Sequence, residues 1–458
     1  MTKIGLEIHG YLNTKEKLFC QCRNFQSEKE NVAICPICTG QPGSKPMLPN
    51  SEAIKKSIQI ALMVDAKINT IENGKKLVWQ RKHYDWPDLP KGYQNTLSGT
   101  YAFPIGENGR FLGIKIKELH LEEDPAAWNP ETGFIDYNRS GSPLIEIVTE
   151  PDFKSSDEVK EWIKKLIITF SYIKAINKKA GIKADVNISF EDTKIKTERT
   201  EVKNINSIKE ISKVIDYEIR RHKREFPKLR ETRRWNVEEG KTELMRQKES
   251  HADYRFINDP DLPIIKITNI KVEKIKSSLP ETPQEKLSKL IKKYKISREH
   301  AETLSKNLDI VEFFEGVAKK INPEFALPWI NVELLRVLNY NKKTLDEVSI
   351  EIKHFVELMQ LVQKGKITEL KAKQILNKFV PKSFSPSDEL EYSRKITGKN
   401  EIIKIIDEII KNNEKAVKDY MEGEEKALNF LIGEIMKLSN RRIDYKIAAE
   451  ILKNKLKK

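Results

Sequence analysis

The sequence predicts an α+β protein whose N-terminal part is mainly β-structure and whose C-terminal part is helical. In the first half, short strand-like segments place polar side chains on one face and apolar side chains on the other. Turn-forming pairs, among them Pro42-Gly43 and Pro87-Asp88, are dense up to about residue 150. After about residue 280, glycine becomes rare and apolar residues recur at helical spacing, as at Leu287 and Leu290.

The first clear elements are a hairpin and a helix. Asn108-Gly109 lies between two segments with aromatic and apolar residues, and we expect a β-hairpin turn there, because Asn-Gly favours such turns. A helix is predicted over residues 155–178. Ser155 and Glu158 form a capping box at its start, and apolar residues follow at helical spacing.

Two strands and a second helix are expected next. The strands cover residues 183–190 and 199–205, and the helix runs from about 207 to 225. This helix ends in the basic cluster 220–224. The cluster could touch phosphates, or it could simply complement the helix dipole at the C-terminal turn.

Two proline-containing breaks divide the chain of 458 residues, a length that suits two to four domains. The first break lies around Pro280 and Pro283, and the second is the Ser/Pro-rich stretch 381–386. We therefore expect a catalytic domain, a helical domain and a helical tail domain. Their expected ranges are 1–282, 283–385 and 386–458.

Composition limits the class of protein and suggests a partner. Hydrophobic residues make up 38% and charged residues 33% of the chain, as in soluble proteins. The formal net charge of +15 favours a polyanionic partner such as RNA, although a Lys/Ile-rich composition from AT-rich codons would give the same excess. We find no run of roughly 18 apolar residues and no signal peptide, so we expect a cytoplasmic protein without a membrane span.

All four cysteines lie within residues 20–38. Cys20 and Cys22 form one close pair, Cys35 and Cys38 form another, and twelve residues separate the pairs. Two such pairs match a structural Zn²⁺ site of four thiolates. Two disulfides or free thiols are the alternatives, and a reducing compartment disfavours disulfides.

Four strand-like segments carry metal-seeking side chains on one face. Glu7 and His9 share a face in the first segment, and Asp185 and Asn187 share a face in another. The remaining two segments are His120–Asp124 and Thr200–Asn204. Carboxylates gathered on one side of a sheet repel one another unless they are hydrated, paired or given cations. Oxygen ligands of this kind suit Mg²⁺ or Mn²⁺.

No glycine-rich phosphate loop is present in the sequence, neither Gly-x-x-x-x-Gly-Lys-Ser/Thr nor Gly-x-Gly-x-x-Gly. A nucleotide would therefore be held through metal ions and through Lys or Arg side chains. From the residues alone, the chain is either a magnesium-dependent nucleotide enzyme or a zinc-stabilised RNA-binding protein.

A series of segments, kept in one order along the chain, forms a more specific pattern. The segments are Ile4–His9, Lys17–Cys20, Cys35–Gly43, Arg81–Tyr84, Pro87–Gln94, His120–Asp124, Asp136–Asp152, Glu201–Ser207, Glu231–Trp235, Asp259–Pro263 and Ala427–Gly433. With these segments the chain resembles, over nearly its whole length, the B subunits of the tRNA-dependent amidotransferases. This family converts Glu-tRNA(Gln) or Asp-tRNA(Asn) to the amide form.

The resemblance implies a glutamine-synthetase-like, mainly antiparallel β cradle followed by helical domains. It also implies that the chain uses ATP and Mg²⁺ to phosphorylate the side-chain carboxylate of the amino acid carried by tRNA. Ammonia would then displace the phosphate. It would be released from glutamine by the amidase (A) subunit of a heterotrimer whose third member is a small (C) subunit. Metal ions and cations suit such phosphoryl transfer.

The resemblance also assigns roles to residues. It places Glu7, His9, Glu122, Glu123, Asp185 and Glu201 in catalysis, as Mg²⁺ ligands (Glu7, His9, Glu122, Asp185, Glu201) or behind them. Lys82 and Lys203 are expected to contact phosphate, and Arg139 the substrate carboxylate. For any single acidic residue, an ordinary surface ion pair is the alternative. The small helical tail is expected to bind tRNA phosphates through Arg441, Arg442, Lys446, Lys453 and Lys455, with a solvated basic face as the alternative.

The chain departs from the family pattern at two places. Pro125-Ala-Ala stands where many members have Ala-Gly-Lys, so a basic phosphate contact is missing there. Lys183 stands where an arginine is common, and it can supply a point charge but not a bidentate fork.

Two rival interpretations and one open choice remain. One rival is the related archaeal-type protein that pairs with an asparaginase-like partner, but its large inserted domain has no room here. The other is a non-catalytic tRNA-binding protein, which would not need clustered acids. No glutaminase signature is recognisable, so ammonia must come from another chain. The choice between Asp-tRNA(Asn) and Glu-tRNA(Gln) stays open.

Overall fold

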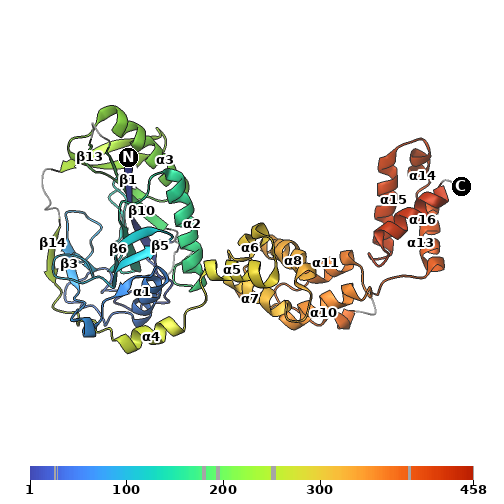
Figure 1. Cartoon of the computed structure of the whole chain (residues 1–458), viewed down its shortest axis with the longest axis horizontal. Helices are drawn as coiled ribbons and strands as arrows, with labels where there is room; N and C mark the ends of the chain where they lie inside the picture. Colours follow the sequence, from blue (N-terminus) through green and yellow to red (C-terminus); the bar gives the residue numbers. More distant parts are fainter. Residues whose placement is uncertain are drawn as a thin grey trace. The chain divides into compact units, whose positions relative to one another are not determined.

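The computed structural model describes residues 1–24, 27, 29–177, 182–191, 196–248, 254–389 and 394–456, without the side chains of residues 204 and 246–248. The chain divides into two compact units, Met1–Thr282 and Pro283–Lys458 (Figure 1). Within the described ranges, none of the helices combines the length and the hydropathy needed to span a bilayer.

Unit 1 is built on a twelve-stranded sheet that is antiparallel except for the β11–β12 pair. Its main path runs β13-β12-β11-β10-β1-β9-β6-β4-β3-β14, with β5 beside β6 and β2 beside β5. The strands are β1 (Thr2–Tyr11), β2 (Lys67–Ile68), β3 (Gln80–His83), β4 (Gln94–Thr96), β5 (Gly106–Phe111), β6 (Ile114–Glu123), β9 (Pro143–Thr149), β10 (Ile182–Phe190), β11 (Thr200–Ile205), β12 (Arg230–Asn236), β13 (Lys241–Lys248) and β14 (Arg255–Asn258). Two short strands, β7 (Ala127–Trp128) and β8 (Ile135–Asp136), form a separate ladder. The predicted mixed class, with a mainly antiparallel sheet followed by helices, is confirmed.

The sheet has an apolar face covered by helices and a polar face on its other side. The covering helices are α1 (Ser51–Met63), α2 (Ser156–Tyr172), α3 (Ile208–Glu225) and α4 (Asn269–Ser277), and they share one core with the strands. Figure 1 shows α2 and α3 along one side of the sheet. On β1, Leu6 and Ile8 are buried in this core, while Glu7 and His9 alternate with them and face the other way.

Helix α2 begins as predicted and ends earlier. The Ser155 side chain accepts a hydrogen bond from the N–H of Glu158, which caps the helix. The helix stops at Tyr172 rather than near residue 178. The chain then pairs with the end of β1, where the Asn177 N–H donates to the Tyr11 carbonyl, so sheet-like pairing replaces the last predicted turn.

The predicted hairpin exists, but its turn lies later than Asn108-Gly109. Both residues are inside β5, and the chain reverses at Leu112-Gly113, where both residues have positive φ. Gly109 is needed for packing instead, because a Cβ there would lie 2.9 Å from the Val64 carbonyl oxygen. The prediction of the turn position was therefore wrong.

The predicted strands and helix between residues 183 and 225 are confirmed as β10, β11 and α3. Ser207 caps α3 by accepting from the Glu210 N–H. In the basic cluster at its end, Arg221 is buried and holds Glu218 with Nη2 at 2.9 Å. At least this member of the cluster therefore serves the fold, because a buried charge requires a partner.

His222 lies beside this ion pair and is expected to make unit 1 sensitive to acid. Its ring nitrogens lie 2.7 Å from Thr197 Oγ1 and 2.9 Å from Thr200 Oγ1. Burial, followed by the charge of Arg221, lowers the pKa of His222 to about 4. The unfolded chain takes up this proton near pH 6.5, so stability present above that pH is lost as the pH falls toward 4. The loss should reach about 3 kcal/mol.

Urea unfolding of the wild type and of His222→Gln between pH 7 and pH 4.5 measures this effect. Carboxylates elsewhere titrate equally in both proteins, so the free energy of unfolding of the wild type should fall more steeply. Parallel pH profiles would contradict the role of His222.

Unit 2 is helical throughout its described residues. Its α-helices are α5 (Pro283–Tyr294), α6 (Arg298–Leu304), α7 (Leu308–Val317), α8 (Pro323–Pro328), α9 (Leu335–Tyr340), α10 (Ile352–Gln363), α11 (Glu369–Asn377), α13 (Lys399–Asn412), α14 (Glu414–Met421), α15 (Glu425–Leu438) and α16 (Tyr445–Leu456). Two apolar clusters stabilise it, one with its buried members between residues 290 and 379 and one between 396 and 456. A π-helical stretch, Trp329–Leu334, joins α8 to α9 directly after Pro328, whose missing N–H interrupts the hydrogen-bond ladder.

Candidate active site

The polar face of the sheet in unit 1 gathers acidic side chains from five strands. In the sheet register, Glu7 on β1 stands opposite Asp185 on β10, and His9 stands opposite Glu146 on β9. Because alternate residues share a face, these side chains and those of Glu122 on β6 and Glu201 on β11 gather on one side. They form two groups in which the potential ligand atoms all lie within 4.8 Å of one another.

The first group is Glu7, Asp185 and Glu201. The Lys203 ammonium lies 2.7 Å from Asp185 Oδ2 and also contacts Glu201. Asn187 donates from Nδ2 to Glu7 Oε1 at 3.1 Å. Burial, together with the neighbouring carboxylates, raises the pKa of Glu7 although Lys203 opposes this rise. The group therefore holds more negative charge than one lysine neutralises, which favours binding of a divalent cation.

Replacing Lys203 by glutamine is expected to destabilise unit 1 in metal-free buffer by about 2–4 kcal/mol. Burial alone would lower the pKa of Lys203, but the charges of Asp185 and Glu201 raise it, so the lysine stabilises both carboxylates. Without it, they repel each other in a poorly solvated place. Thermal unfolding in EDTA and with millimolar Mn²⁺ measures the effect, and the metal should restore part of the loss.

Lys213→Gln is the matched control for this prediction. Lys213 pairs with Glu210 at 2.8 Å, but its side chain is 50% exposed, so its removal should cost no more than about 1 kcal/mol. An equal loss in both variants, or no effect of the metal on Lys203→Gln, would contradict the cation-binding interpretation.

The second group is His9, Glu122 and Glu146. His9 Nε2 lies 3.7 Å from Glu146 Oε1. Burial alone would lower the pKa of His9, but its hydrogen bond to Glu146 and the charge of that carboxylate raise it to about 9. Burial alone would likewise lower the pKa of Lys82, but the charges of Glu122 and Glu146 raise it. Without a metal ion, His9 therefore keeps a proton between the carboxylates. The two carboxylates and the imidazole are a donor set that could bind Mg²⁺ or Mn²⁺ in place of this proton.

The structure separates the two neighbouring acids of β6. Glu122 joins the second group, with Gln94 Nε2 donating to it at 3.3 Å. Glu123 points to the other side of the strand, where Lys91 lies 2.5 Å from Oε1 and the Asn95 N–H donates to the same oxygen at 2.8 Å. Glu123 therefore lies outside both groups, and a catalytic role for it stays a prediction.

Arg139 lies near Tyr11, the next residue of β1 after Glu7 and His9 on the same face of the sheet. The Tyr11 hydroxyl donates to Asp124 Oδ2 at 2.7 Å, and Arg139 Nε lies 3.2 Å from the same oxygen. Lys183 donates to the Tyr11 hydroxyl at 3.4 Å. This end of the polar face therefore carries two cations beside the acidic groups, an arrangement that suits an anionic substrate.

Sequence reasoning missed Glu146. Its signal was present, because Glu146 is the only charged residue in the strand Pro143–Thr149. An acid within an apolar strand at the middle of a sheet needs a partner or a cation.

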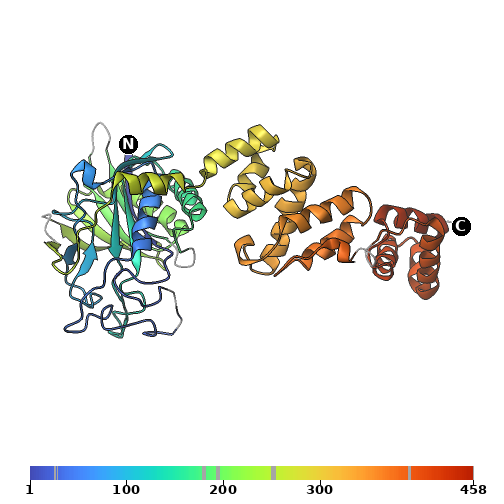
Figure 2. The same cartoon turned by 90° about the horizontal axis from the view of Figure 1, so that it is seen from below.

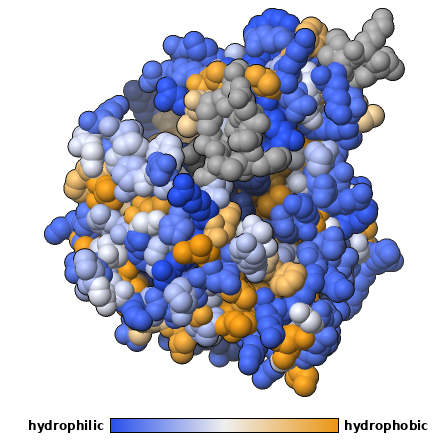
Figure 3. Space-filling model, turned by 90° about the vertical axis from the view of Figure 1, so that its left-hand side faces the viewer, coloured by the Kyte–Doolittle hydropathy of each residue, from blue (hydrophilic) through white to orange (hydrophobic). Residues whose placement is uncertain are grey.

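Figure 3 shows the side of unit 1 that carries β3 and β14, where hydrophilic residues dominate and hydrophobic residues are scattered.

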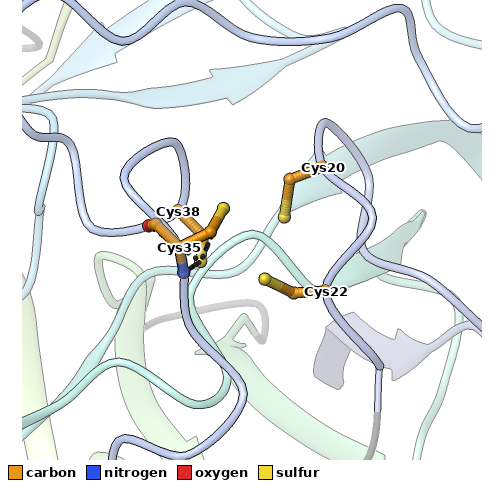
Figure 4. A group of neighbouring side chains, drawn as sticks. All are labelled: Cys20, Cys22, Cys35 and Cys38. Carbon is orange, nitrogen blue, oxygen red and sulfur yellow. Dashed lines mark hydrogen bonds between the residues drawn. The ribbon is translucent and has the colours of Figure 1, made fainter.

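The four cysteines converge from two loops of unit 1, as Figure 4 shows. Figure 2 shows this loop region, in dark blue, at the lower margin of the unit as drawn. All four are free thiols, and their sulfur atoms lie within 4.8 Å of one another. This donor set fits a tetrahedral Zn²⁺ site.

One cysteine is prepared for the thiolate form. A hydrogen bond from Cys20 and, more weakly, the charge of Lys17 lower the pKa of Cys38 to about 5 despite burial. Lys17 is buried, lies 3.5 Å from Cys38 Sγ and donates to the Ala33 carbonyl at 2.8 Å. Burial raises the pKa of Cys22 to about 11, so this thiol holds its proton until a metal displaces it.

The basic residues of the tail differ in their surroundings. Arg441, Lys446 and Lys453 are exposed. Arg442 is partly buried and donates from Nε to the Ser439 carbonyl at 3.3 Å, and Lys455 pairs with Asp407. The role of these five residues in tRNA binding stays a prediction.

Comparison with known proteins shows the family of the chain. A family model described as the GatB/GatE catalytic domain matches residues 2–273, and one described as the GatB domain matches residues 312–456. One relative is a protein of Methanocaldococcus jannaschii that is 43% identical over 473 aligned residues. The alignment covers 100% of this chain and 98% of the relative. Another, from Methanococcus maripaludis, is 41% identical over 468 residues, with 99% and 98% covered. A third, from Methanopyrus kandleri, is 38% identical over 467 residues, again with 99% and 98% covered.

All three relatives are named as the B subunit of an aspartyl/glutamyl-tRNA(Asn/Gln) amidotransferase. The family models together match most of the chain, and the relatives match almost all of it. The chain therefore belongs to the GatB/GatE family of amidotransferase B subunits.

Proposed function

We propose that this chain is the ligase component that amidates the amino acid carried by a misacylated tRNA. In the first step, the side-chain carboxylate of Asp-tRNA(Asn) or Glu-tRNA(Gln) attacks the γ-phosphorus of ATP, which gives an acyl phosphate and ADP. In the second step, ammonia attacks the acyl carbon and displaces inorganic phosphate. The product is the amide, Asn-tRNA(Asn) or Gln-tRNA(Gln).

The observation that carries this proposal is the pair of acidic groups on one sheet face, flanked by cations. Glu7, Asp185 and Glu201 would hold one Mg²⁺, and His9, Glu122 and Glu146 another. Bound Mg²⁺ neutralises phosphate charge and aligns the phosphoryl group.

Three cations of this chain have places in the proposed reaction. Lys82 and Lys203, whose pKa values are raised by the same carboxylates, keep their protons and can contact the transferred phosphoryl group. Arg139 would hold the substrate carboxylate, and Asp124, which accepts a hydrogen bond from Tyr11, orients its guanidinium.

The proposal includes partners and a structural metal. A glutamine-hydrolysing amidase (the A subunit) would release ammonia, a small C subunit would complete a heterotrimer, and the tail would bind the tRNA body. Zn²⁺ at the four cysteines would stabilise the loops beside the sheet. The reaction would take place in the cytoplasm, where aminoacylated tRNAs are used for translation.

The test is ATP hydrolysis by the chain co-expressed with its amidase partner, with and without Glu-tRNA(Gln) or Asp-tRNA(Asn), in Mg²⁺. Turnover should require a misacylated tRNA and should vanish in Glu7→Ala, and the more active tRNA identifies the substrate. If tRNA binds but no charged tRNA stimulates ATP use, the chain is an RNA-binding scaffold and the ligase assignment fails.

A further inference from the structure

Two tryptophans of unit 1, one of them exposed, are in contact with each other. Trp86 follows β3 and is 51% exposed, and Trp128, the last residue of β7, is partly buried. Their ring centroids are 5.6 Å apart and their planes meet at 76°, an edge-to-face contact. The partly buried Trp128 thus supports the exposed indole of Trp86, whose large apolar surface is available to a ligand.

Hydrogen bonds connect both tryptophan-bearing segments to Arg139. Arg139 donates from Nη2 to the carbonyl of Ala126, two residues before Trp128, at 3.1 Å. The Ala126 N–H in turn donates to the carbonyl of Asp88, two residues after Trp86, at 2.9 Å. The pair is therefore held near the end of the polar face where the substrate carboxylate is expected.

The chain segment before Trp86 carries aromatic and cationic contacts near the acidic groups. Tyr84, two residues before Trp86, makes an edge-to-face contact with Tyr254 at 5.9 Å, and Lys82 Nζ lies 4.7 Å from the centroid of Tyr254. Burial and nearby carboxylates, Glu122 among them, raise the pKa of Tyr84, in keeping with its position at the edge of the site. The segment Lys82–Trp86 thus leads from a lysine beside the second acidic group to the exposed indole.

We propose that Trp86 and Trp128 stack against unpaired nucleotides at the 3′ end of the aminoacylated tRNA. The inference rests on the proposed function, in which the reacting carboxylate is joined to the terminal ribose by only a few bonds. When that carboxylate lies at Arg139, the terminal nucleotides must lie just outside the acidic groups. Unpaired RNA bases stack on aromatic side chains, and Lys183, beside Tyr11, supplies positive charge for a phosphate.

The test measures tRNA binding by the full chain with its amidase partner, with intact tRNA and with tRNA that lacks its three 3′ nucleotides. Trp86→Ala and Trp128→Ala should each raise the Kd for intact tRNA by about tenfold, within the range found when a stacking aromatic is removed. Neither variant should change the Kd for the truncated tRNA. Trp86→Phe should retain most of the affinity, and the KM for ATP should stay unchanged in all variants.

Leu112→Ala is the matched surface control. Leu112 is 44% exposed in the β5–β6 turn, next to Phe111, which packs against Trp162 of α2 on the helix-covered side. This variant should bind intact tRNA as the wild type does.

Two results would overturn the proposal. One is an equal loss of affinity for intact and truncated tRNA. The other is unchanged tRNA binding accompanied by weaker association with the amidase partner, which would make the tryptophans a protein interface. Because this assay measures binding, it separates the two ideas: a Trp86 effect that needs the 3′ nucleotides supports stacking even if ATP hydrolysis fails.

Discussion

Replacing Glu146 by glutamine is expected to reduce tRNA-dependent ATP hydrolysis by about 100-fold, the upper end of the loss found for residues behind a metal ligand. Glu146 can offer an oxygen to the metal ion itself, and it also holds His9. Glutamine keeps the shape and removes the charge. The negative charge that favours a cation between His9, Glu122 and residue 146 would thus fall by half.

Several measurements separate this effect from misfolding. Steady-state ATP turnover with saturating charged tRNA should fall, while the Tm and the tRNA affinity should change little. The KM for Mg²⁺ should rise, and Mn²⁺, which binds such ligands more tightly, should recover part of the rate. Glu150→Gln is the control, because Glu150 lies just beyond the end of β9 and belongs to neither acidic group. Near-normal turnover of Glu146→Gln would remove the second group from the site.

Replacing Cys38 by serine is expected to abolish zinc binding and to lower the Tm of unit 1 by roughly 10 °C. Metal at about a thousand times its Kd contributes about 4 kcal/mol, and a domain of this size loses about 2–4 °C per kcal/mol. Cys38 is the thiol whose pKa is lowered to about 5, so its loss removes the ligand that most readily becomes a thiolate and leaves buried Lys17 without its sulfur partner. In the residues that the structure describes, these loops contain no helix or strand near the cysteines, and hydrogen bonds such as that from Ser140 to the Cys38 carbonyl hold them in place.

Metal analysis and thermal unfolding test this prediction. The purified wild type should contain one zinc per chain, and Cys38→Ser should contain almost none. A strong chelator should lower the Tm of the wild type toward that of the variant without affecting the variant. Leu48→Ala, in the same loop region but 77% exposed, should keep both zinc and Tm. A zinc-free wild type with an unchanged Tm in the chelator would show that the cysteines are free thiols.

The sequence by itself determined which side chains share a face and where the four cysteines gather. The alternation of Glu7 and His9 with Leu6 and Ile8 predicted a polar face, because successive residues of a strand point to opposite sides. The cysteine pairs were predictable for a similar reason: each pair is local, and two short loops need only approach each other. The change from strands to helices was equally visible in the spacing of apolar residues.

Only the tertiary structure decided which of these residues meet. β9 lies between β1 and β6 although it is far from β1 in sequence, and this placement brings Glu146 to His9 and Glu122. The strand register also places Glu122, and not Glu123, in the group with His9 and Glu146, because two adjacent residues of a strand face opposite sides. Long-range packing likewise explains why α2 ends before its predicted end and why the β5–β6 turn lies at Leu112-Gly113 rather than at Asn108-Gly109. Local periodicity gives each side chain a direction, but strand order and register depend on contacts between segments distant in the chain, and those contacts form the site.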